Sequence, residues 1–237
     1  MRACVIVFPG SNADAEMIAA LAGAASTPPT VVWHTETALP ADTDLVAIPG
    51  GFSYGDYLRC GALAKVSPIV PAIREHAAKG RLVLGVCNGF QILTEIGLLP
   101  GGLTRNRQMR FECGDRYIRV AARGAFTRTV GAVWRMPVAH AEGRYVASPE
   151  LLEQLNGEDR VAVRYCDARG EVVDEANFNG SAESIAGIYG GPYRNILGLM
   201  PHPERAVDPR TGGADGVELF AAAVATLAGG KSTSALV

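Results

Sequence analysis

The segment 81-RLVLGVCNGFQIL-93 decides the fold. Residues 81–86 form a continuous β-favouring run, and residues 88–96 carry apolar side chains at helical spacing. Gly85-Val86-Cys87-Asn88-Gly89 therefore lies where a buried strand meets a helix, as in the nucleophile elbow G-x-S-x-G, with cysteine in place of serine. The pentapeptide predicts a reactive thiol at a strand's carboxyl end. A buried cysteine in an ordinary strand–helix turn remains the alternative.

Short apolar runs alternate with amphipathic stretches on both sides of this segment, which predicts a parallel sheet covered by helices. The expected strands of the first half are 3–8, 30–34, 45–48 and 81–86, and the expected helices are 12–23, with Asn12 as its cap, 69–78 and 88–96. Later strand-like runs at 117–121, 130–137, 161–166 and 184–189 predict a small antiparallel portion. A main-sheet strand at 195–200 and a closing helix at 213–228 follow. We expect one domain over 1–228 and a flexible tail over 229–237.

The composition fits a compact enzyme. The chain has 237 residues, 48% of them hydrophobic and 19% charged, with a net charge of −2. This balance gives no electrostatic basis for binding nucleic acid. No apolar run approaches the roughly 20 residues that span a bilayer, so we expect no membrane segment and a cytoplasmic protein. The five cysteines show neither zinc-type spacing nor an even count, which argues against a metal site or a disulfide framework.

A catalytic thiol needs a base, and the base needs a group that orients it. His202 directly follows an apolar strand in Met200-Pro201-His202-Pro203-Glu204-Arg205, and Glu204 projects the same way two residues later. The structural alternative for this segment is a rigid loop with a surface ion pair of Glu204 with His202 or Arg205. His140 and Glu142 repeat the same spacing and compete for the catalytic role. Catalytic groups gather at the carboxyl ends of central strands, which favours His202.

A thiol that attacks a carbonyl group produces a negatively charged oxygen, the oxyanion. Backbone N–H donors at the same edge of the sheet would stabilise this oxyanion. The Asn88 amide is one candidate, since it opens the helix after the thiol. Pro49-Gly50-Gly51-Phe52 follows the strand at 45–48, and its glycines let backbone N–H groups approach a ligand closely. A plain turn is the alternative for this pair of glycines.

Several of these stretches resemble one family. Residues 85–91, GVCNGFQ, resemble the G-x-C-x-G-x-Q signature of class I glutamine amidotransferases, and 201-PHPE-204 resembles their C-terminal His-x-Glu. Residues 50–59, GGFSYGDYLR, and 198–205, GLMPHPER, are similar to the small glutaminase subunits of phosphoribosylformylglycinamidine synthases. The resemblance covers nearly the whole chain except the tail, and it implies a flavodoxin-like open sheet.

The resemblance also implies roles for individual residues. Cys87, His202 and Glu204 correspond to the catalytic triad, and Gly51 and Asn88 correspond to the oxyanion donors. The remaining pocket residues are assigned to glutamine binding: Gly50, Gln91 and Asn106. This family usually has glycine where this chain has Ala141, and we expect the methyl group to disturb a backbone with positive φ there.

The implied activity is hydrolysis of L-glutamine, with ammonia passed to a large synthetase subunit, in a complex that also contains a small third subunit. ATP and Mg²⁺ are expected on the synthetase, and neither a cofactor nor a metal on this chain. Two other functions remain open: a stand-alone thiol amidohydrolase of similar fold, and an inactive subunit that only docks the synthetase.

Overall fold

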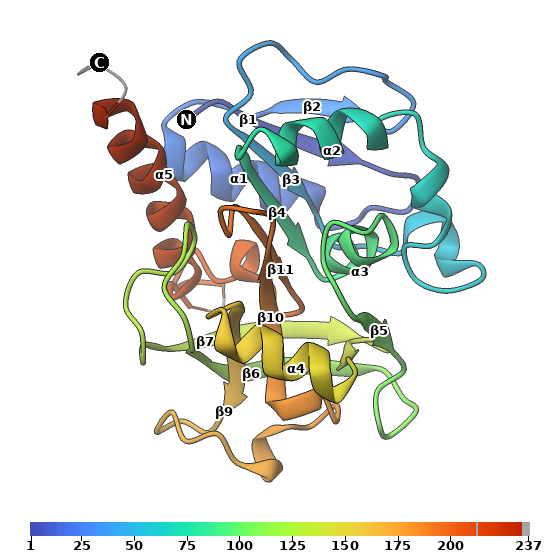
Figure 1. Cartoon of the computed structure of the whole chain (residues 1–237), viewed down its shortest axis with the longest axis vertical. Helices are drawn as coiled ribbons and strands as arrows, with labels where there is room; N and C mark the ends of the chain where they lie inside the picture. The colour runs from blue at the N-terminus through green and yellow to red at the C-terminus, as the bar shows by residue number, and fades with distance from the viewer. Residues whose placement is uncertain (212, 234–237) are drawn as a thin grey trace.

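One large sheet runs through the molecule (Figure 1). The computed structural model describes residues 1–211 and 213–233, and within them this sheet has nine strands in the order β2-β1-β3-β4-β11-β10-β9-β6-β7. A separate two-stranded sheet pairs β5 with β8. The strands are β1 Ala3–Val7, β2 Thr30–Trp33, β3 Leu45–Ile48, β4 Leu82–Val86, β5 Gly102–Thr104, β6 Glu112–Val120, β7 Val133–His140, β8 Arg144–Val146, β9 Val161–Cys166, β10 Ile185–Gly190 and β11 Ile196–Leu199. The α-helices are α1 Asp14–Ala25, α2 Val70–Ala78, α3 Asn88–Glu95, α4 Pro149–Gly157 and α5 Gly216–Thr233.

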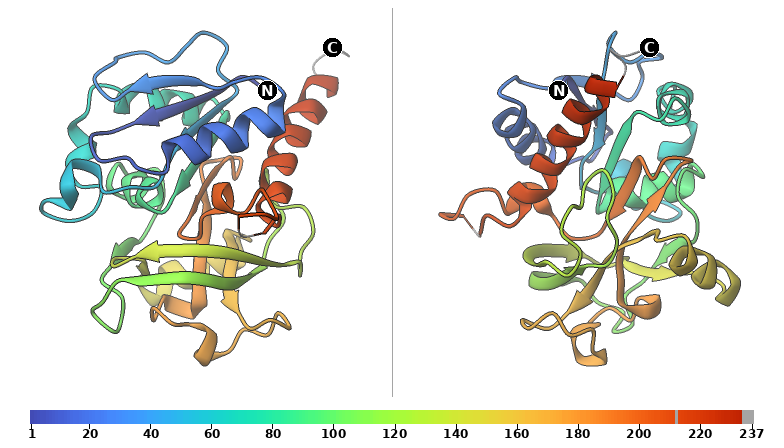
Figure 2. Two further views of the ribbon diagram at one scale, coloured as in Figure 1. Left: turned by 180° about the vertical axis from the view of Figure 1, so that it is seen from behind. Right: turned by 60° about the vertical axis from the view of Figure 1, so that its left-hand side comes forward.

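The strands β2, β1, β3, β4 and β11 pair in parallel. The central strands β3 and β4 are buried along their whole length, as expected for short apolar strands with helices on both faces. In Figure 1 α2 and α3 lie in front of these strands, and the view from behind in Figure 2 shows α1 and α5 crossing the opposite face. The predicted open parallel sheet with helices on both faces is confirmed.

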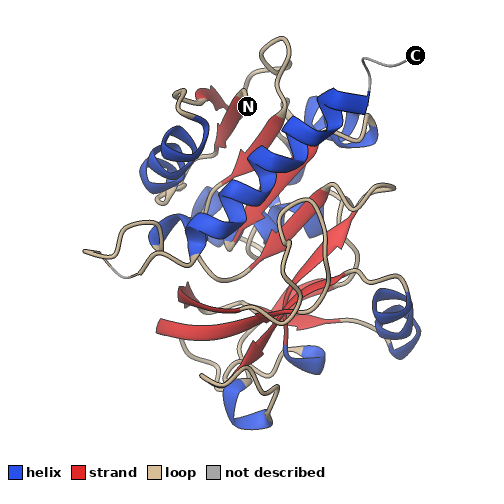
Figure 3. Ribbon diagram, turned by 90° about the vertical axis from the view of Figure 1, so that its left-hand side faces the viewer, coloured by secondary structure: helices blue, strands red, loops and turns tan. Residues whose placement is uncertain are grey.

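The antiparallel portion continues the same sheet. β10 pairs antiparallel with β11, and β9, β6 and β7 follow outward in antiparallel order. Figure 3 shows these strands as the lower, more twisted half of one sheet. The four strand-like runs predicted for the antiparallel portion correspond to β6, β7, β9 and β10, and they extend the main sheet because β10 pairs with the central strand β11.

Three of the helices differ from those predicted, in their existence, their first residue or their last residue. The helix α4 was not predicted, although Ser148 caps it by accepting a hydrogen bond from the Leu151 N–H (3.3 Å) and a proline opens it. The expected capping by Asn12 is wrong, since α1 begins at Asp14 with Ala13 in the cap position. α5 extends to Thr233, so the start of the expected tail is helical. Residues 234–237 of that tail lie outside the described residues, and the division at 228 stays a prediction.

Among the residues that the structure describes, no helix combines the length and the apolar character needed to cross a membrane.

Candidate active site

The thiol of Cys87 sits on a strained turn between β4 and α3. Cys87 has φ 52° and ψ −106°, a backbone conformation that costs a residue with a side chain about 1–3 kcal/mol. Its N–H donates to the Leu199 carbonyl on β11 (2.8 Å), so the neighbouring strand holds the turn in place. The side chain is 5% exposed. Strain at a cysteine held between a central strand and a helix fits a nucleophile elbow.

The two glycines of the elbow are sterically required. A Cβ on Gly89 would lie 2.0 Å from the Ile48 carbonyl oxygen, and a Cβ on Gly85 would lie 2.7 Å from the Gly89 backbone. Helix α3 therefore packs directly onto β3 and β4 through these positions. This close packing holds the turn, and the Cys87 thiol on it, at the carboxyl edge of the sheet.

His202 and Glu204 form a buried pair just beyond β11. The Nδ1 atom of His202 lies 2.5 Å from Oε1 of Glu204, and each residue is 2% exposed. The His202 N–H donates to the Pro137 carbonyl on β7 (2.8 Å), which ties the segment to the antiparallel half of the sheet. Because Glu204 occupies Nδ1, the Nε2 atom is left for the thiol, and it has no hydrogen-bond partner within the described chain.

The surroundings of His202 favour the imidazolium form. Burial by itself lowers the pKa of His202, but the negative charges of Glu204 and of Cys87 outweigh burial and raise the pKa to about 10. The imidazole ring is therefore a proton donor at neutral pH.

A cavity of about 220 Å³ brings the thiol and the imidazole together. Its wall is formed by Asn12, Gly51, Phe52, Cys87, Phe111, Ala139, His202 and Arg205. The thiol donates to the Ala139 carbonyl oxygen, 3.7 Å from Sγ. The elements that meet here are the carboxyl ends of β1, β3, β4 and β11, together with the end of β7, as expected for an open α/β sheet.

Both candidate oxyanion donors lie at this edge of the sheet. Gly51 faces Ser11 across an isolated antiparallel bridge whose hydrogen bonds are made by the N–H groups of Asn12 and Phe52 (3.2 and 2.8 Å), so the Gly51 N–H itself points away from that segment. The N–H of Asn88 belongs to the first turn of α3, where helix donors have no partner within the helix. Two free donors beside a thiol are the arrangement that stabilises a tetrahedral intermediate.

The competing histidine, His140, does not reach the cavity. Its ring packs on Phe178, and Nδ1 bonds with the Asn106 side-chain oxygen (3.1 Å). Ala139 lines the cavity, and neighbours on an extended strand point to opposite faces. Burial and the charge of His202 lower the pKa of His140 to about 3, which makes it a poor base. The geometry favours His202.

The three residues assigned to glutamine binding lie beside the cavity rather than on its wall. Gly50 packs against the His202 ring, since a Cβ there would lie 2.6 Å from Cε1 of His202. The Gln91 and Asn106 side chains are buried and hydrogen-bonded within the protein, Gln91 to Asn88 and to the Glu142 carbonyl, Asn106 to the loop after β7. Their contact with glutamine stays a prediction that these hydrogen bonds do not support.

The expectation for Ala141 is wrong. Its φ is not positive, so the methyl group costs nothing, and its carbonyl accepts a hydrogen bond from the Asn106 N–H (2.8 Å). The position in this loop that requires glycine is Gly143, where a Cβ would lie 2.3 Å from the His140 ring.

Four residues of the cavity wall were not predicted as site residues: Asn12, Phe111, Ala139 and Arg205. The position of Asn12 in the sequence could have identified it. Asn12 follows β1, and the carboxyl ends of parallel strands, where the other cavity residues lie, share one edge of the sheet. Arg205 directly follows Glu204 in the same short turn. Among the described residues, no three His, Cys, Asp or Glu side chains gather in a way that suits a metal ion.

Known proteins match the chain along nearly its whole length. It is 55% identical over 224 residues to the phosphoribosylformylglycinamidine synthase subunit PurQ of Bradyrhizobium diazoefficiens, covering 93% of this chain and 96% of that protein. The PurQ protein of Rhodospirillum rubrum is 51% identical, covering 96% of this chain and 100% of that protein.

Solved structures agree with the fold. The structure of PurLQS from Thermotoga maritima superposes with a TM-score of 0.83 at 40% identity, covering 95% of this chain and 98% of that one. A glutamine amidotransferase from Thermotoga maritima shares the fold, with a TM-score of 0.58 at 17% identity, and the match covers 89% of this chain and 78% of that one. The model of the CobB/CobQ-like glutamine amidotransferase domain matches residues 1–213, and the chain belongs to this family.

Proposed function

We propose that the chain is the glutaminase subunit of a phosphoribosylformylglycinamidine synthase, which hydrolyses L-glutamine and delivers the ammonia to a synthetase subunit. One observation carries the proposal: a single cavity is lined by a strained thiol and by a buried imidazole whose other nitrogen is held by a carboxylate. The names of the similar proteins support the same activity. A cytoplasmic location accompanies this role.

In the first half of the reaction, the Cys87 thiolate attacks the side-chain carbonyl carbon of glutamine. The π-electron pair moves to oxygen, and the N–H groups of Gly51 and Asn88 stabilise the oxyanion, by about 3–4 kcal/mol per donor. The imidazolium of His202 then protonates the amide nitrogen. The C–N bond breaks, ammonia leaves, and a glutamyl thioester remains on Cys87.

In the second half, His202 is neutral and accepts a proton from water. The water oxygen attacks the thioester carbon, the C–S bond breaks, and glutamate leaves as the thiolate returns. Glu204 holds the ring in the tautomer that keeps Nε2 facing the thiol, and its charge stabilises the imidazolium in both halves.

The ammonia has to reach an acceptor without loss to water, so the partner should cover the cavity. The matched Thermotoga maritima structure, PurLQS, supports a multi-subunit assembly. We assign ATP and Mg²⁺ binding to the large synthetase subunit, and we expect a small third subunit in the complex. Activity of the isolated chain should accordingly be low.

Two exposed loops at the cavity, residues 52–59 and 108–111, suit this docking and are called the mouth loops. Phe52 and Phe111 line the cavity and are 44% and 49% exposed, and the loops also expose Tyr57 (75%), Leu58 (85%) and Met109 (67%). Both loops lie on the same side of the molecule in Figures 1 and 2. Exposed apolar side chains at the exit of the product are what an apolar patch of the ammonia acceptor would cover.

Replacement of Leu58 by glutamate tests this docking face. The variant should bind the synthetase subunit at least about 10-fold more weakly, because a charge replaces an apolar side chain in the proposed docking face. Titration calorimetry or analytical ultracentrifugation measures the change. Val31→Glu, at an equally apolar exposed position (52%) on the edge strand β2, is the matched control and should bind normally. Equal affinities for both variants would place the partner elsewhere.

The activity itself is tested with a glutamine-analogue electrophile and a glutaminase assay. The electrophile should label Cys87, free glutamine should block the labelling, and glutamine turnover should rise when the synthetase subunit is added. Labelling that glutamine does not block would favour the stand-alone thiol hydrolase instead. Full turnover without the partner would contradict the coupling.

A further inference from the structure

The mouth loop 52–59 has an unusual backbone. Three of its residues that carry side chains, Tyr54, Asp56 and Leu58, have positive φ values of 54°, 56° and 71°. Residues with side chains rarely adopt this left-handed region, because the Cβ atom comes close to a backbone carbonyl oxygen. Within the described residues, the backbone of Leu58 makes no hydrogen bond to another backbone group. The loop therefore needs contacts outside its own backbone to keep this shape.

The side chain of Tyr54 fixes the first half of the mouth loop. Its Oη atom lies 2.9 Å from Nδ1 of His34 and 2.9 Å from Oγ of Ser67. A phenol hydroxyl can donate one hydrogen bond and accept another, so both bonds can form together. Both partners come from outside the loop, since His34 follows β2 and Ser67 precedes α2.

The two partners of the Tyr54 hydroxyl are themselves held in place. The His34 ring stacks on Phe8 with ring centroids 5.9 Å apart, and it meets the Tyr54 ring edge-on at 5.5 Å. The His34 N–H donates to the Val7 carbonyl (3.0 Å), which continues the pairing of β2 with β1. Ser67 is buried. The hydroxyl therefore connects the mouth loop to the parallel half of the sheet.

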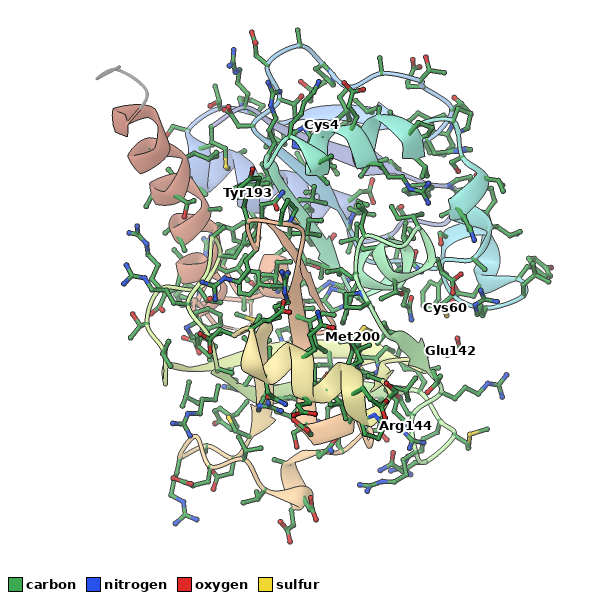
Figure 4. All side chains as sticks on the ribbon, in the orientation of Figure 1. Cys4, Cys60, Glu142, Arg144, Tyr193 and Met200 are labelled. Carbon is green, nitrogen blue, oxygen red and sulfur yellow. The ribbon has the colours of Figure 1, made fainter. Side chains whose placement is uncertain are left out.

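The far end of the mouth loop is held by charged groups. Arg59 donates from Nε and Nη2 to the two carboxylate oxygens of Glu95 at the end of α3 (2.5 and 2.6 Å). Because Arg59 is largely exposed to water, this ion pair contributes less than its geometry suggests. Cys60 follows directly, and Figure 4 shows it near Glu142 in the loop after β7. Burial and then the carboxylates of Asp56 and Glu142 raise the pKa of Cys60, so the thiol between them stays protonated.

Between these two ends the mouth loop presents Tyr57 and Leu58 to water, 75% and 85% exposed. Both belong to the proposed docking face. A loop that already has its bound shape loses little conformational entropy on binding, so this preorganisation strengthens the complex. If only a fraction of the molecules kept the shape, the apparent Kd would rise in inverse proportion to that fraction.

We infer that Tyr54, His34 and Ser67 are positioning residues, which hold the mouth loop 52–59 in the shape that the synthetase subunit recognises. The inference rests on the proposed function and deepens it, because it assigns part of the affinity for the partner to hydrogen bonds inside this chain. The Tyr54 hydroxyl is engaged by His34 and Ser67, so its removal should act through the shape of the loop.

The test compares Tyr54→Phe, Ser67→Ala and the double variant, each as a full chain titrated with the synthetase subunit in a calorimeter. The net contribution of one hydrogen bond corresponds to about a fivefold change in an equilibrium constant. Tyr54→Phe loses two bonds, and its Kd should rise about 10-fold. Ser67→Ala loses one bond, and its Kd should rise about threefold. The double variant should bind no more weakly than Tyr54→Phe, because that change already removes the contact with Ser67.

Tyr189→Phe is the matched control. The Tyr189 hydroxyl, on β10, also makes two contacts, with the Thr127 hydroxyl (2.7 Å) and with the Phe126 N–H, which donates to it (3.3 Å). The change removes the same atom from a fully buried site, so it should lower the melting temperature. Its Kd for the synthetase subunit should stay at the wild-type value. The control thus separates loss of the loop's shape from a general loss of stability.

Cleavage by chymotrypsin reports the shape of the mouth loop in the isolated chain. This protease cuts after exposed aromatic residues, and a loosened loop should be cut after Tyr57 at least about threefold faster in Tyr54→Phe than in the wild type. Tyr193 is 72% exposed and lies well apart from Cys60 in Figure 4. Cleavage after Tyr193 is the internal reference and should not change. Mass spectrometry identifies each cut.

An unchanged Kd in a folded Tyr54→Phe variant would overturn the inference. So would a weaker complex without faster cleavage and with a wild-type Kd in Ser67→Ala, since the Tyr54 hydroxyl would then contact the partner directly. If Tyr54→Phe does not fold, Ser67→Ala decides by the same two measurements. A wild-type chain that does not bind the synthetase subunit would refute the proposed function, and the cleavage rates would still show whether Tyr54 holds the loop.

Discussion

Replacement of Cys87 by alanine is expected to lower glutamine-dependent ammonia release by about 10⁴-fold or more, because the thioester can no longer form. The synthetase should still work when ammonium salt is supplied, since its own site is untouched. A coupled assay of the complex measures both rates on the same preparation. If ammonia-dependent synthesis is retained, the complex is intact, and the loss of glutamine-dependent activity is due to the missing nucleophile.

A matched cysteine gives the control for this result. Cys166 on β9 is also buried, and its pKa is raised by burial to about 11, so it is a protonated, unreactive thiol. Cys166→Ala should leave glutamine turnover within about twofold of wild type, as expected away from the reacting groups. Glutamine-dependent synthesis that persists in Cys87→Ala would show that this subunit only docks the synthetase.

The second large effect is expected for Glu204→Gln, which keeps the shape of the side chain but removes its charge. Turnover should fall about 10³–10⁴-fold, as in other triads that lose the carboxylate, because the imidazolium loses its stabilising partner and the ring its fixed tautomer. Steady-state kinetics of the complex measures the change. A loss below tenfold would mean that Glu204 is only a packing neighbour.

The pH dependence gives an independent readout of the same variant. In the wild type the pKa of His202 is raised to about 10, so the imidazolium is present at neutral pH and is lost only as the pH rises through that value. Removing the charge of Glu204 takes away one of the causes that raise the pKa of His202, so the pKa falls. The alkaline limb of the kcat/KM profile should therefore move to lower pH in Glu204→Gln. An unchanged limb would assign it to another group.

The sequence was sufficient for the part of the site that depends on local geometry. Gly85 and Gly89 flank Cys87 because a strand and a helix meet there without room for side chains, and that steric demand leaves a fixed spacing in the sequence. His202 and Glu204 are two residues apart in one short segment, so their contact is also local. The segment of Cys87 and the segment of His202 each follow a strand of the parallel sheet. They were expected to meet because catalytic groups gather at the carboxyl ends of such strands.

The residues of the cavity wall and the partners of the buried side-chain amides could not be predicted, because they depend on contacts between segments that are far apart in the sequence. Ala139 on β7 contacts the thiol although β7 lies at the far end of the sheet order from β4, and the spacing of residues does not reveal this contact. Gln91 and Asn106 matched the pattern of a substrate pocket, yet their amides meet backbone groups of a distant loop. The type of each side chain showed that it could form hydrogen bonds, but only the tertiary fold showed which groups it bonds with.

The sheet order has a consequence for how the protein matures. Strand β4, which leads into Cys87, has β11 as its neighbour, and β11 comes last in the sequence among the strands of the described residues. On the ribosome the amino-terminal part emerges first, at about 5–20 residues per second, so the edge of β4 stays unpaired until residues 196–199 have emerged. A nascent chain therefore contains the Cys87 thiol before the imidazole of His202 has been synthesised, and the two side chains can meet only after β11 has joined β4.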